Sequence, residues 1–357
     1  MKIGIYSPYL NTLGGGERYI LLIASYLANQ NTVHLFWDDK SITKKARLNL
    51  NINLERVNII PNIFSNKNNL YKLLKKLKKT REYNILFYVT DGSLFFSLAK
   101  KNILIIHAPS HFPPKNSLIN ILKLKNWSTI LCYSGYIQKF IKAQLKRDAL
   151  IIYPPIAVDS FIPGIKKNII LSVGRFFGGK PHSKKQDFLF NTFKELINEG
   201  LQGWQLIFAG VADKTGEIFA KKLQKKIKNY PISIKTNLPF SLLKNLYSSA
   251  KVYWHATGFG EDLKKFPEKA EHFGITTAEA MAAGCVPVVI NSGAQPEIVT
   301  DKKNGYLFNT KNELKQKTLS LMKNQNILKK LSRAAQKTVQ KFSEQNFYQN
   351  IDDLVKN

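Results

Sequence analysis

Residues 271–284 read EHFGITTAEAMAAG, and this stretch decides how the second half of the chain folds. The run Ile275–Ala283 is rich in small, helix-forming residues, and the apolar run Val286–Ile290 after it predicts a buried strand. Glu271 lies in the loop before the predicted helix, and we expect Glu279 in its first turn. The unpaired N–H groups of a helix start bind phosphate, and flanking carboxylates accept hydroxyl hydrogen bonds. The pattern therefore suits a sugar nucleotide.

Both carboxylates also have purely structural interpretations. Thr276 and Glu279 have the spacing of a capping box, in which the acid only satisfies the start of its own helix. Glu271 would then be a solvated loop acid. The residues by themselves leave both interpretations open.

Length and composition indicate a globular protein of two domains. The chain has 357 residues, of which 44% are hydrophobic. Its two cysteines, Cys132 and Cys285, are far apart and lack metal-binding spacing, so we expect buried thiols in a cytoplasmic protein. The first residues are too strand-like for a signal peptide, and no apolar run approaches the roughly 20 residues that span a bilayer.

The net charge is strongly positive. Lys and Arg number 54 against 24 Asp and Glu, which gives +30, and the excess is shared between the two sides of residue 160. Such a surface favours anions such as phospholipid headgroups, nucleic acid or a phosphorylated substrate. Because the sequence contains no zinc-finger spacing, RNP-like string or helix-turn-helix, we expect no nucleic-acid partner.

Two similar β-loop-α-β units predict two doubly wound α/β domains with parallel sheets. The first comprises Lys2–Tyr6, the loop Asn11–Gly16, the helix Glu17–Asn29 and Val33–Trp37; the second comprises Ile169–Val173, the loop Gly174–Ser183, the helix Gln186–Glu199 and Gln205–Ala209. Further strands are predicted at Ile85–Val89, Ile103–Ile106, Thr129–Cys132 and Val252–Trp254. The proline-rich segment Pro154–Gly164 suits a linker. A helix is predicted at Ser343–Val355 from its apolar stripe.

The glycine run Gly14–Gly16 directly follows the first strand region and can approach a phosphate closely. A dinucleotide fold is the nearest rival, since Asp38 and Asp39 lie where a ribose-binding acid would stand. However, G-G-G-E departs from G-x-G-x-x-G, and no P-loop motif occurs. The loop therefore favours neither an oxidoreductase nor a P-loop phosphotransferase.

Basic residues follow the first strand of the second unit. Arg175 comes directly after that strand, where ligands bind in open α/β sheets. Lys180, Lys184 and Lys185 follow, and together these cations could balance a diphosphate without a divalent metal. No D-x-D pair occurs, which agrees with metal independence. Any single lysine can instead be solvated surface.

Several of these motifs resemble retaining GT-B glycosyltransferases of family 4. The similarity is carried by GGGER at Gly14–Arg18, SVGR at Ser172–Arg175, the stretch Glu271–Glu297 and NGYLF at Asn304–Phe308. HATGFGED at His255–Asp262 is similar to the mannosyltransferase branch that extends lipid-linked oligosaccharides, and to its bacterial relatives.

This resemblance implies two facing Rossmann-like domains. Residues 1–160 would bind the acceptor, residues 161–340 would bind the nucleotide sugar, and the helix in residues 341–357 would cross back to the first domain. The implied reaction is of class EC 2.4: a hexose, with mannose from a GDP donor as first candidate, moves with retention to a lipid-linked or polysaccharide acceptor. The resemblance implies no metal and no other cofactor.

The resemblance also assigns roles around the second domain. Glu271 would hold the sugar hydroxyls and Glu279 the ribose, while Arg175 would neutralise the leaving diphosphate. Aligning KKQDFLFNTF with the family pattern places Lys184 at the diphosphate-binding lysine, with Lys185 as the alternative one residue away. The backbone donors would come from Phe273, Gly274, Ile275 and Thr276.

In the first domain, the resemblance places Gly15 and Gly16 against the donor's diphosphate. His107 ends a predicted strand, and in the family the matching histidine contacts the transferred sugar. A lone histidine there is as often structural. His111 is a further candidate for the acceptor side.

A possible membrane face lies at Asn69–Arg81, which reads NLYKLLKKLKKTR. Its apolar residues lie on one face of a helix and its lysines on the other. The leucines would dock on the core and leave the lysines in water, or the lysines would bind an anionic membrane surface and hold the protein peripherally on its cytoplasmic side. The basic segment Lys115–Trp127 could flank an acceptor mouth.

Two other functions remain as alternatives to glycosylation of a lipid-linked acceptor. The first is a nucleotide-sugar enzyme with a non-lipid acceptor. The second is a non-enzymatic protein that binds anionic surfaces.

Overall fold

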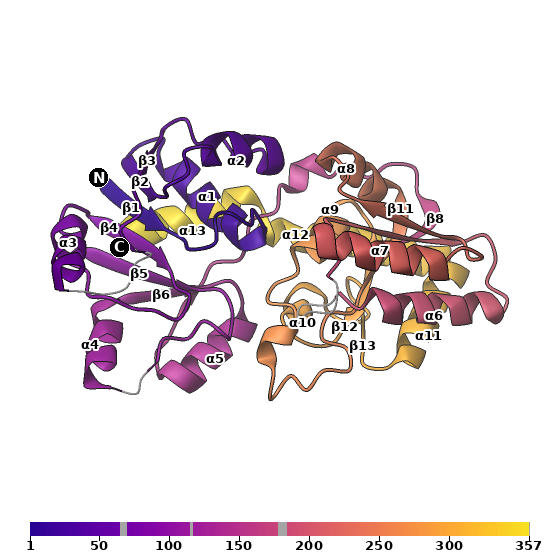
Figure 1. Ribbon diagram of the computed structural model, residues 1–357. Helices are drawn as coiled ribbons and strands as arrows, with labels where there is room; N and C mark the ends of the chain where they lie inside the picture. The colour runs from indigo at the N-terminus through magenta and orange to yellow at the C-terminus, as the bar shows by residue number, and fades with distance from the viewer. Residues whose placement is uncertain (65–69, 115–116, 178–183, 357) are drawn as a thin grey trace. The chain divides into compact units, whose positions relative to one another are not determined.

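The computed structural model describes residues 1–64, 70–114, 117–177 and 184–356, and its chain divides into two compact units (Figure 1). Unit 1 comprises Met1–Pro155 and Gln345–Asn357, and unit 2 comprises Ile156–Glu344. Over the described ranges, no helix has both the length and the apolar character needed to cross a membrane.

Within its described residues, unit 1 contains a sheet of seven parallel strands in the order β3-β2-β1-β4-β5-β6-β7. The strands are β1 (Lys2–Tyr6), β2 (Thr32–Phe36), β3 (Val57–Ile60), β4 (Ile85–Val89), β5 (Lys101–Ile106), β6 (Thr129–Cys132) and β7 (Leu150–Ile151). Strand β1 pairs with β2 on one side and β4 on the other, so the strand order reverses there. Ligands bind beyond the carboxyl ends of the strands at such a reversal.

The helices of unit 1 are α1 (Gly15–Leu27), α2 (Ile42–Leu50), α3 (Leu70–Thr80), α4 (Leu118–Asn126), α5 (Gly135–Leu145) and α13 (Glu344–Lys356). Helix α1 begins two residues before its predicted start, because the carboxylate of Glu17 accepts a hydrogen bond from the N–H of Gly14 (2.6 Å) and fixes the helix start there. Gly15 and Gly16 therefore lie in the first turn of α1 and not in the loop.

The C-terminal helix packs on unit 1, as predicted. Phe347, Ile351 and Leu354 of α13 are buried in the unit 1 core. The hydroxyl of Tyr26 donates to Asp352 (2.8 Å), and the ammonium of Lys101 donates to the carbonyl of Leu354 (2.6 Å). A cation at a helix C-terminus is favourable, so α13 is held by charge as well as by apolar contact.

Within its described residues, unit 2 contains a sheet of six parallel strands in the order β10-β9-β8-β11-β12-β13. The strands are β8 (Lys167–Val173), β9 (Gln205–Gly210), β10 (Ile232–Thr236), β11 (Ala250–His255), β12 (Val286–Ile290) and β13 (Tyr306–Phe308). The order reverses between β8 and β11. The prediction of two doubly wound α/β units is therefore confirmed.

The helices of unit 2 are α6 (Gln186–Asn198), α7 (Lys214–Lys226), α8 (Phe240–Ser249), α9 (Ile275–Ala282), α10 (Gln295–Ile298), α11 (Lys311–Lys323) and α12 (Gln325–Val339), with short 3₁₀ turns η1 (Val158–Ser160), η2 (Pro267–Lys269) and η3 (Gln340–Phe342). The helix and strand predicted around residues 271–290 are present as α9 and β12. The placement of Glu279 in the first turn is wrong. The helix starts after Gly274, so Glu279 is its fifth residue.

Lys166 joins the ends of two helices of unit 2. Its ammonium donates to the carbonyls of Tyr247 (3.3 Å), Ala250 (2.9 Å) and Ala283 (2.6 Å). Tyr247 and Ala250 stand at the end of α8, and Ala283 follows α9. Carbonyls at helix C-termini have no partner within the helix, so one lysine satisfies groups from both helices.

Replacing this lysine with methionine is expected to destabilise the protein. Lys166→Met keeps most of the apolar stem but removes the ammonium from all three carbonyls, and leaves those of Tyr247 and Ala250 with only the weak thiol donor of Cys285. We expect a loss of about 2 kcal/mol in the free energy of unfolding, measured with urea. Its neighbour Lys167 is exposed, so Lys167→Met should change stability by less than about 0.5 kcal/mol. Equal losses in the two variants would contradict the assignment.

Candidate functional site

The candidate site of unit 2 lies where its strand order reverses. Gly174 and Arg175 follow the carboxyl end of β8, and His255 is the last residue of β11. Gly174 lies close to the stem of Lys184, since a side chain at Gly174 would meet Lys184 Cγ at 2.7 Å. Lys184 therefore lies beside the carboxyl end of β8.

Two side chains converge on one carboxylate at these strand ends, and a third contacts one of the two. Lys184 Nζ lies 2.6 Å from Glu271 Oε2, and His255 Nε2 lies 2.9 Å from the same oxygen. The hydroxyl of Thr257 lies 3.2 Å from His255 Nε2. The Glu271 side chain is 16% exposed, so the interpretation of Glu271 as a solvated loop acid is wrong.

The charges of this cluster follow from burial and pairing. Burial by itself would raise the pKa of Glu271, but the charge of Lys184 and the hydrogen bond from His255 lower this pKa well below its ordinary value. Burial lowers the pKa of His255, although Glu271 opposes this effect. At neutral pH the site therefore holds an ionised carboxylate, an ammonium and a neutral imidazole.

The backbone of Glu271 is held by the loop after β12. Gly293 has φ of +62°, and a side chain there would lie 2.4 Å from the carbonyl oxygen of Glu271. The N–H of Ala294 donates to that carbonyl (2.9 Å). A glycine at position 293 thus permits the close approach that fixes the carboxylate's position.

The start of α9 lies three residues after Glu271. Its N-cap, Gly274, has φ of +110°, and its carbonyl accepts the N–H groups of Thr277 (3.0 Å) and Ala278 (3.1 Å). The N–H groups of Ile275 and Thr276 have no acceptor within the helix. The capping-box interpretation of Thr276 and Glu279 is wrong, because the Thr276 hydroxyl accepts from Tyr253 (2.8 Å) and Gly274 caps the helix.

Glu279 is buried on the same helix. The hydroxyl of Tyr247 donates to Glu279 Oε2 (2.9 Å). Burial raises the pKa of Tyr253, and the negative charges of Glu271 and Glu279 raise it further. Both carboxylates thus help to raise the pKa of one buried tyrosine, Tyr253, which also donates a hydrogen bond to Thr276 in the first turn of α9.

The remaining basic candidates are placed differently. Lys185 pairs with Glu261 (2.5 Å), not with Glu271, and Glu261 also pairs with Lys269 (2.7 Å). The guanidinium of Arg175 has no hydrogen bond or ion pair with any residue that the structure describes. Lys180 and most of its loop lie outside the described residues. Phe273 packs its ring against Phe342, so only its backbone is available to a ligand.

Buried polar atoms without partners gather around the same segment. Among the described residues, neither amide atom of Gln295 has a hydrogen-bond partner, and the same holds for the hydroxyls of Thr277 and Ser292. Gln295 lies against the helix start, since a side chain at Gly274 would meet its Nε2 at 2.5 Å. Such groups are costly to bury, so their clustering indicates a place for a polar ligand or water.

Sequence reasoning missed part of this site. Gln295, Tyr247 and Tyr253 received no role, and His255 was named only as the first residue of the motif HATGFGED. Strand-end position could have singled out His255. Tyr247 lies 32 residues from Glu279 in the chain, so no local pattern predicts their hydrogen bond.

Unit 1 has its own cluster at its strand ends. The ring of His107, after β5, lies edge-on to Tyr9 (5.3 Å) and stacks on Tyr133 (5.8 Å). His111 Nε2 lies 3.3 Å from the Tyr9 hydroxyl. A side chain at Gly16 would lie 3.7 Å from the Tyr133 hydroxyl, which is buried and has no partner among the described residues. Two imidazoles, two tyrosine phenols and the start of α1 thus lie together in unit 1.

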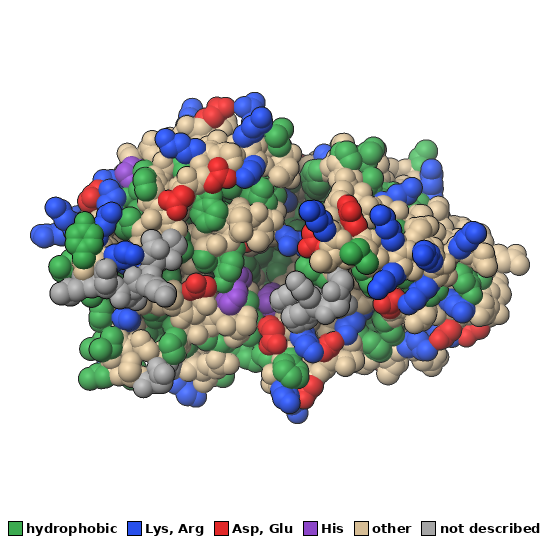
Figure 2. Space-filling model, in the orientation of Figure 1, with side chains coloured by type: hydrophobic (Ala, Val, Ile, Leu, Met, Phe, Trp, Pro, Cys, Tyr) green, Lys and Arg blue, Asp and Glu red, His purple; other side chains and the backbone are tan. Residues whose placement is uncertain are grey.

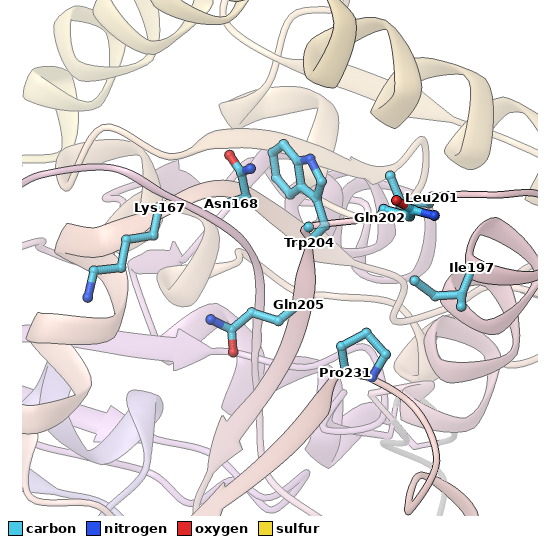
Figure 3. A pocket seen from close by; sticks show the side chains of 9 residues that line it. Lys167, Asn168, Ile197, Leu201, Gln202, Trp204, Gln205 and Pro231 are labelled. Carbon is cyan, nitrogen blue, oxygen red and sulfur yellow. The ribbon is translucent and has the colours of Figure 1, made fainter.

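A separate pocket of about 590 Å³ lies at the opposite edge of the unit 2 sheet (Figure 3). Lys167 and Asn168 begin β8, Gln205 begins β9, and Pro231 precedes β10, so these residues line it from the amino ends of the strands. Because ligands of open α/β sheets bind at carboxyl ends, this pocket does not belong to the site around Glu271. Among the described residues, no group of three or more His, Cys, Asp or Glu side chains is arranged to hold a metal ion.

Comparison with curated proteins finds glycosyltransferases. The chain is 26% identical over 230 residues to the GDP-Man:Man(3)GlcNAc(2)-PP-Dol alpha-1,2-mannosyltransferase of Dictyostelium discoideum, covering 60% of this chain and 43% of that protein. It is 27% identical over 259 residues to an uncharacterized glycosyltransferase of Methanocaldococcus jannaschii, covering 69% and 65%. The chain thus spans less than two thirds of the length of these relatives.

Solved structures agree on the fold. The chain is similar to HepE from Anabaena in complex with UDP and glucose, with a TM-score of 0.70, 17% identity and coverage of 100% of this chain and 99% of that one. It is also similar to a glycosyltransferase from Rickettsia africae, with a TM-score of 0.74, 18% identity and coverage of 99% and 97%.

A family model for glycosyl transferases group 1 matches residues 158–338, which is 181 of the 357 residues. This match confirms the resemblance that the sequence motifs carried, and with it the assignment to class EC 2.4. The chain therefore belongs to the group 1 glycosyltransferases, GT-B enzymes of family 4 that use nucleotide-sugar donors.

Proposed function

We propose that this enzyme transfers a hexose, with mannose from a GDP donor as first candidate, to a lipid-linked or polysaccharide acceptor with retention at the anomeric carbon. In this proposal it needs no metal and works peripherally on the cytoplasmic face of a membrane. The observation that carries the proposal is the convergence of Lys184 and His255 on Glu271, three residues before the start of α9.

The donor would occupy the strand ends of unit 2. The N–H groups of Ile275 and Thr276, together with Arg175, would receive the diphosphate. Lys184 is paired with Glu271 (2.6 Å), and on donor binding it would turn to the diphosphate. Glu271 would then accept hydrogen bonds from the sugar hydroxyls while His255 keeps it oriented. Glu279 would accept a hydrogen bond from the ribose.

The acceptor would be received by unit 1. Gly15 and Gly16 in the first turn of α1 would offer backbone donors to the diphosphate of the sugar donor, and His107 would contact the transferred sugar. The strand-end cluster of Tyr9 and His111 would flank the acceptor.

The reaction step needs no protein nucleophile. The bond between the anomeric carbon and the diphosphate oxygen breaks, and the acceptor hydroxyl attacks from the same face. Its proton passes to the departing diphosphate oxygen. The enzyme then contributes orientation and stabilisation of the charge that develops on the leaving group, for which Arg175 and Lys184 are the cations.

Mannose and a lipid-linked acceptor are supported by the curated relatives, whose names specify GDP-mannose and a dolichyl-diphosphate oligosaccharide. A non-lipid acceptor is the second candidate. Thermal shifts with UDP-, GDP- and ADP-sugars test donor choice, and hydrolysis of the bound donor tests activity. Absence of both a shift and hydrolysis with every donor would overturn the proposal.

The two neighbouring lysines are expected to behave differently. Lys184→Gln should lower kcat about 100-fold, because the leaving diphosphate loses a charge-assisted contact. Lys185→Gln removes the ion pair with Glu261, whose side chains are about as exposed as those of the Lys184–Glu271 pair. This variant should change kcat less than about threefold. Steady-state donor hydrolysis measures both. A larger loss in Lys185→Gln would move the diphosphate contact to that residue.

Glu279 is expected to act on donor binding and not on the chemical step. Glu279→Gln should raise the donor KM about tenfold with little change in kcat, because a charge-assisted hydrogen bond to the ribose is lost. Tyr247→Phe removes the hydroxyl that Glu279 accepts but keeps the carboxylate, so the donor KM should stay within about threefold. If Glu279 were only structural, both variants would lower the unfolding temperature and leave KM unchanged.

Ionised Glu271 should stabilise the fold in a pH-dependent way. Its pKa is lower in the folded protein than its ordinary value of 4.5, so its stabilisation is complete above pH 4.5 and is lost as the pH falls through the folded-state pKa. We expect wild type to exceed Glu271→Gln by about 1–3 kcal/mol in unfolding free energy at pH 7, with a smaller difference in acid. A difference that grows below pH 4.5 would contradict this sign.

A further inference from the structure

Helix α4 carries its aliphatic residues on the outside. Leu118 and Ile119 are 71% and 59% exposed, and Ile121 and Leu122 are exposed as well. Only Leu124, among the aliphatic residues of this helix, is buried. Leu118, Ile121 and Leu122 lie on one helical face because they are three and four residues apart. The helix therefore presents an apolar stripe that unit 1 does not cover.

Helix α3 also exposes part of its apolar side. Tyr71 and Leu74 are 73% and 56% exposed. Lys76, in contrast, is buried, with its ammonium 3.5 Å from the carbonyl of Phe64 and over the ring of Phe95. The prediction that every lysine of this helix lies in water is therefore wrong, and part of the leucine face points outward. Asn69 of the predicted segment lies outside the described residues.

Contacts join these two helices into one surface. The N–H of Leu98 donates to the hydroxyl of Thr80 at the end of α3 (3.0 Å), and the N–H of Ser97 donates to Asn126 at the end of α4 (2.8 Å). Burial lowers the pKa of Lys76 on α3, and the charge of Lys123 on α4 lowers it further. The α3–α4 face comprises the exposed residues Tyr71, Leu74, Leu98, Leu118, Ile119 and Leu122.

Cations surround the α3–α4 face. Residues 70–126 contain 11 Lys and Arg but only two acids, Glu82 and Asp91. Glu82 is already paired with Lys2 (2.7 Å) and Lys79 (3.0 Å). Lys75, Lys78 and Lys125 are exposed. Figure 2 shows hydrophobic and basic side chains next to each other over α3, and hydrophobic side chains over α4.

We propose that the α3–α4 face docks unit 1 on an anionic lipid bilayer, with its Leu and Ile side chains between the lipid headgroups and its lysines on the phosphates. Apolar tips within a basic rim fit a membrane interface, where lysine stems reach outward. A nucleic acid would meet the lysines mainly through its phosphates and would leave most of the exposed aliphatic surface in water. This inference deepens the proposed function, because α4 belongs to unit 1, which also carries His107 and His111 of the proposed acceptor side.

Flotation with vesicles tests this docking in the full chain. The test variant is Leu74/Leu118/Ile119/Leu122→Ser. The matched control is Leu48/Leu150/Ile162/Ile165→Ser, which replaces four exposed aliphatic residues outside the α3–α4 face. Each protein is mixed with phosphatidylcholine vesicles with and without phosphatidylglycerol, and its unfolding temperature and its mass by light scattering are recorded.

We expect wild type and the control variant to bind vesicles that contain phosphatidylglycerol, and the test variant to bind them more than about 100-fold more weakly at unchanged unfolding temperature. Wild-type binding should weaken without the anionic lipid. Equal flotation of the test variant, or no flotation of wild type, would overturn the proposal. A wild-type dimer that the test variant loses would make the face an interface between copies and overturn it as well.

Donor hydrolysis in detergent-free buffer separates this inference from the proposed function. The test variant keeps every residue of the strand-end sites, so we expect its rate to match wild type. Loss of vesicle binding with retained hydrolysis supports the docking surface. Vesicle binding by a wild type that hydrolyses no donor would support the surface and count against the proposed function alone.

Discussion

The ion pair between Lys184 and the buried carboxylate of Glu271 constrains the architecture of unit 2. A carboxylate that is largely removed from water is unfavourable unless cations and hydrogen-bond donors surround it. Here the ammonium of Lys184 and the imidazole of His255 approach one oxygen at 2.6 and 2.9 Å. Pairing this buried carboxylate therefore brings both Lys184 and the end of β11 into contact with the segment before α9.

The same requirement explains why this part of the backbone is built from glycines. Gly174 gives room to the stem of Lys184, and Gly293 lets the loop after β12 press against the backbone of Glu271. Gly274 takes a positive φ and turns the chain from Glu271 into α9. The carboxylate, its cation and the helix start are held before any ligand arrives. Such preorganisation is what charge stabilisation in a transferase needs.

The sequence predicted those features that depend on local patterns. Strand periodicity, helix length and the glycine motifs were enough for two doubly wound units and for α9 followed by β12. The family came from the resemblance of motifs such as GGGER and SVGR to known glycosyltransferases. Features that depend on partners distant in the chain were missed. The hydrogen bond from Tyr247 to Glu279 is one, and the burial of Lys76 over Phe95 is another. Amphipathic spacing predicts that a helix has two faces, but it does not decide which of them the core accepts.

Departures from ordinary burial rules occur in each region where a contact with another molecule is proposed. Gln295 and Thr277 in unit 2 and Tyr133 in unit 1 bury polar atoms without partners among the described residues, and all three lie next to helix starts at strand ends. The α3–α4 face does the reverse and leaves aliphatic side chains in water. Each arrangement costs stability in the isolated chain. Polar ligands would satisfy the first and a bilayer would cover the second, so a single requirement, transfer of a polar sugar beside a membrane, accounts for both.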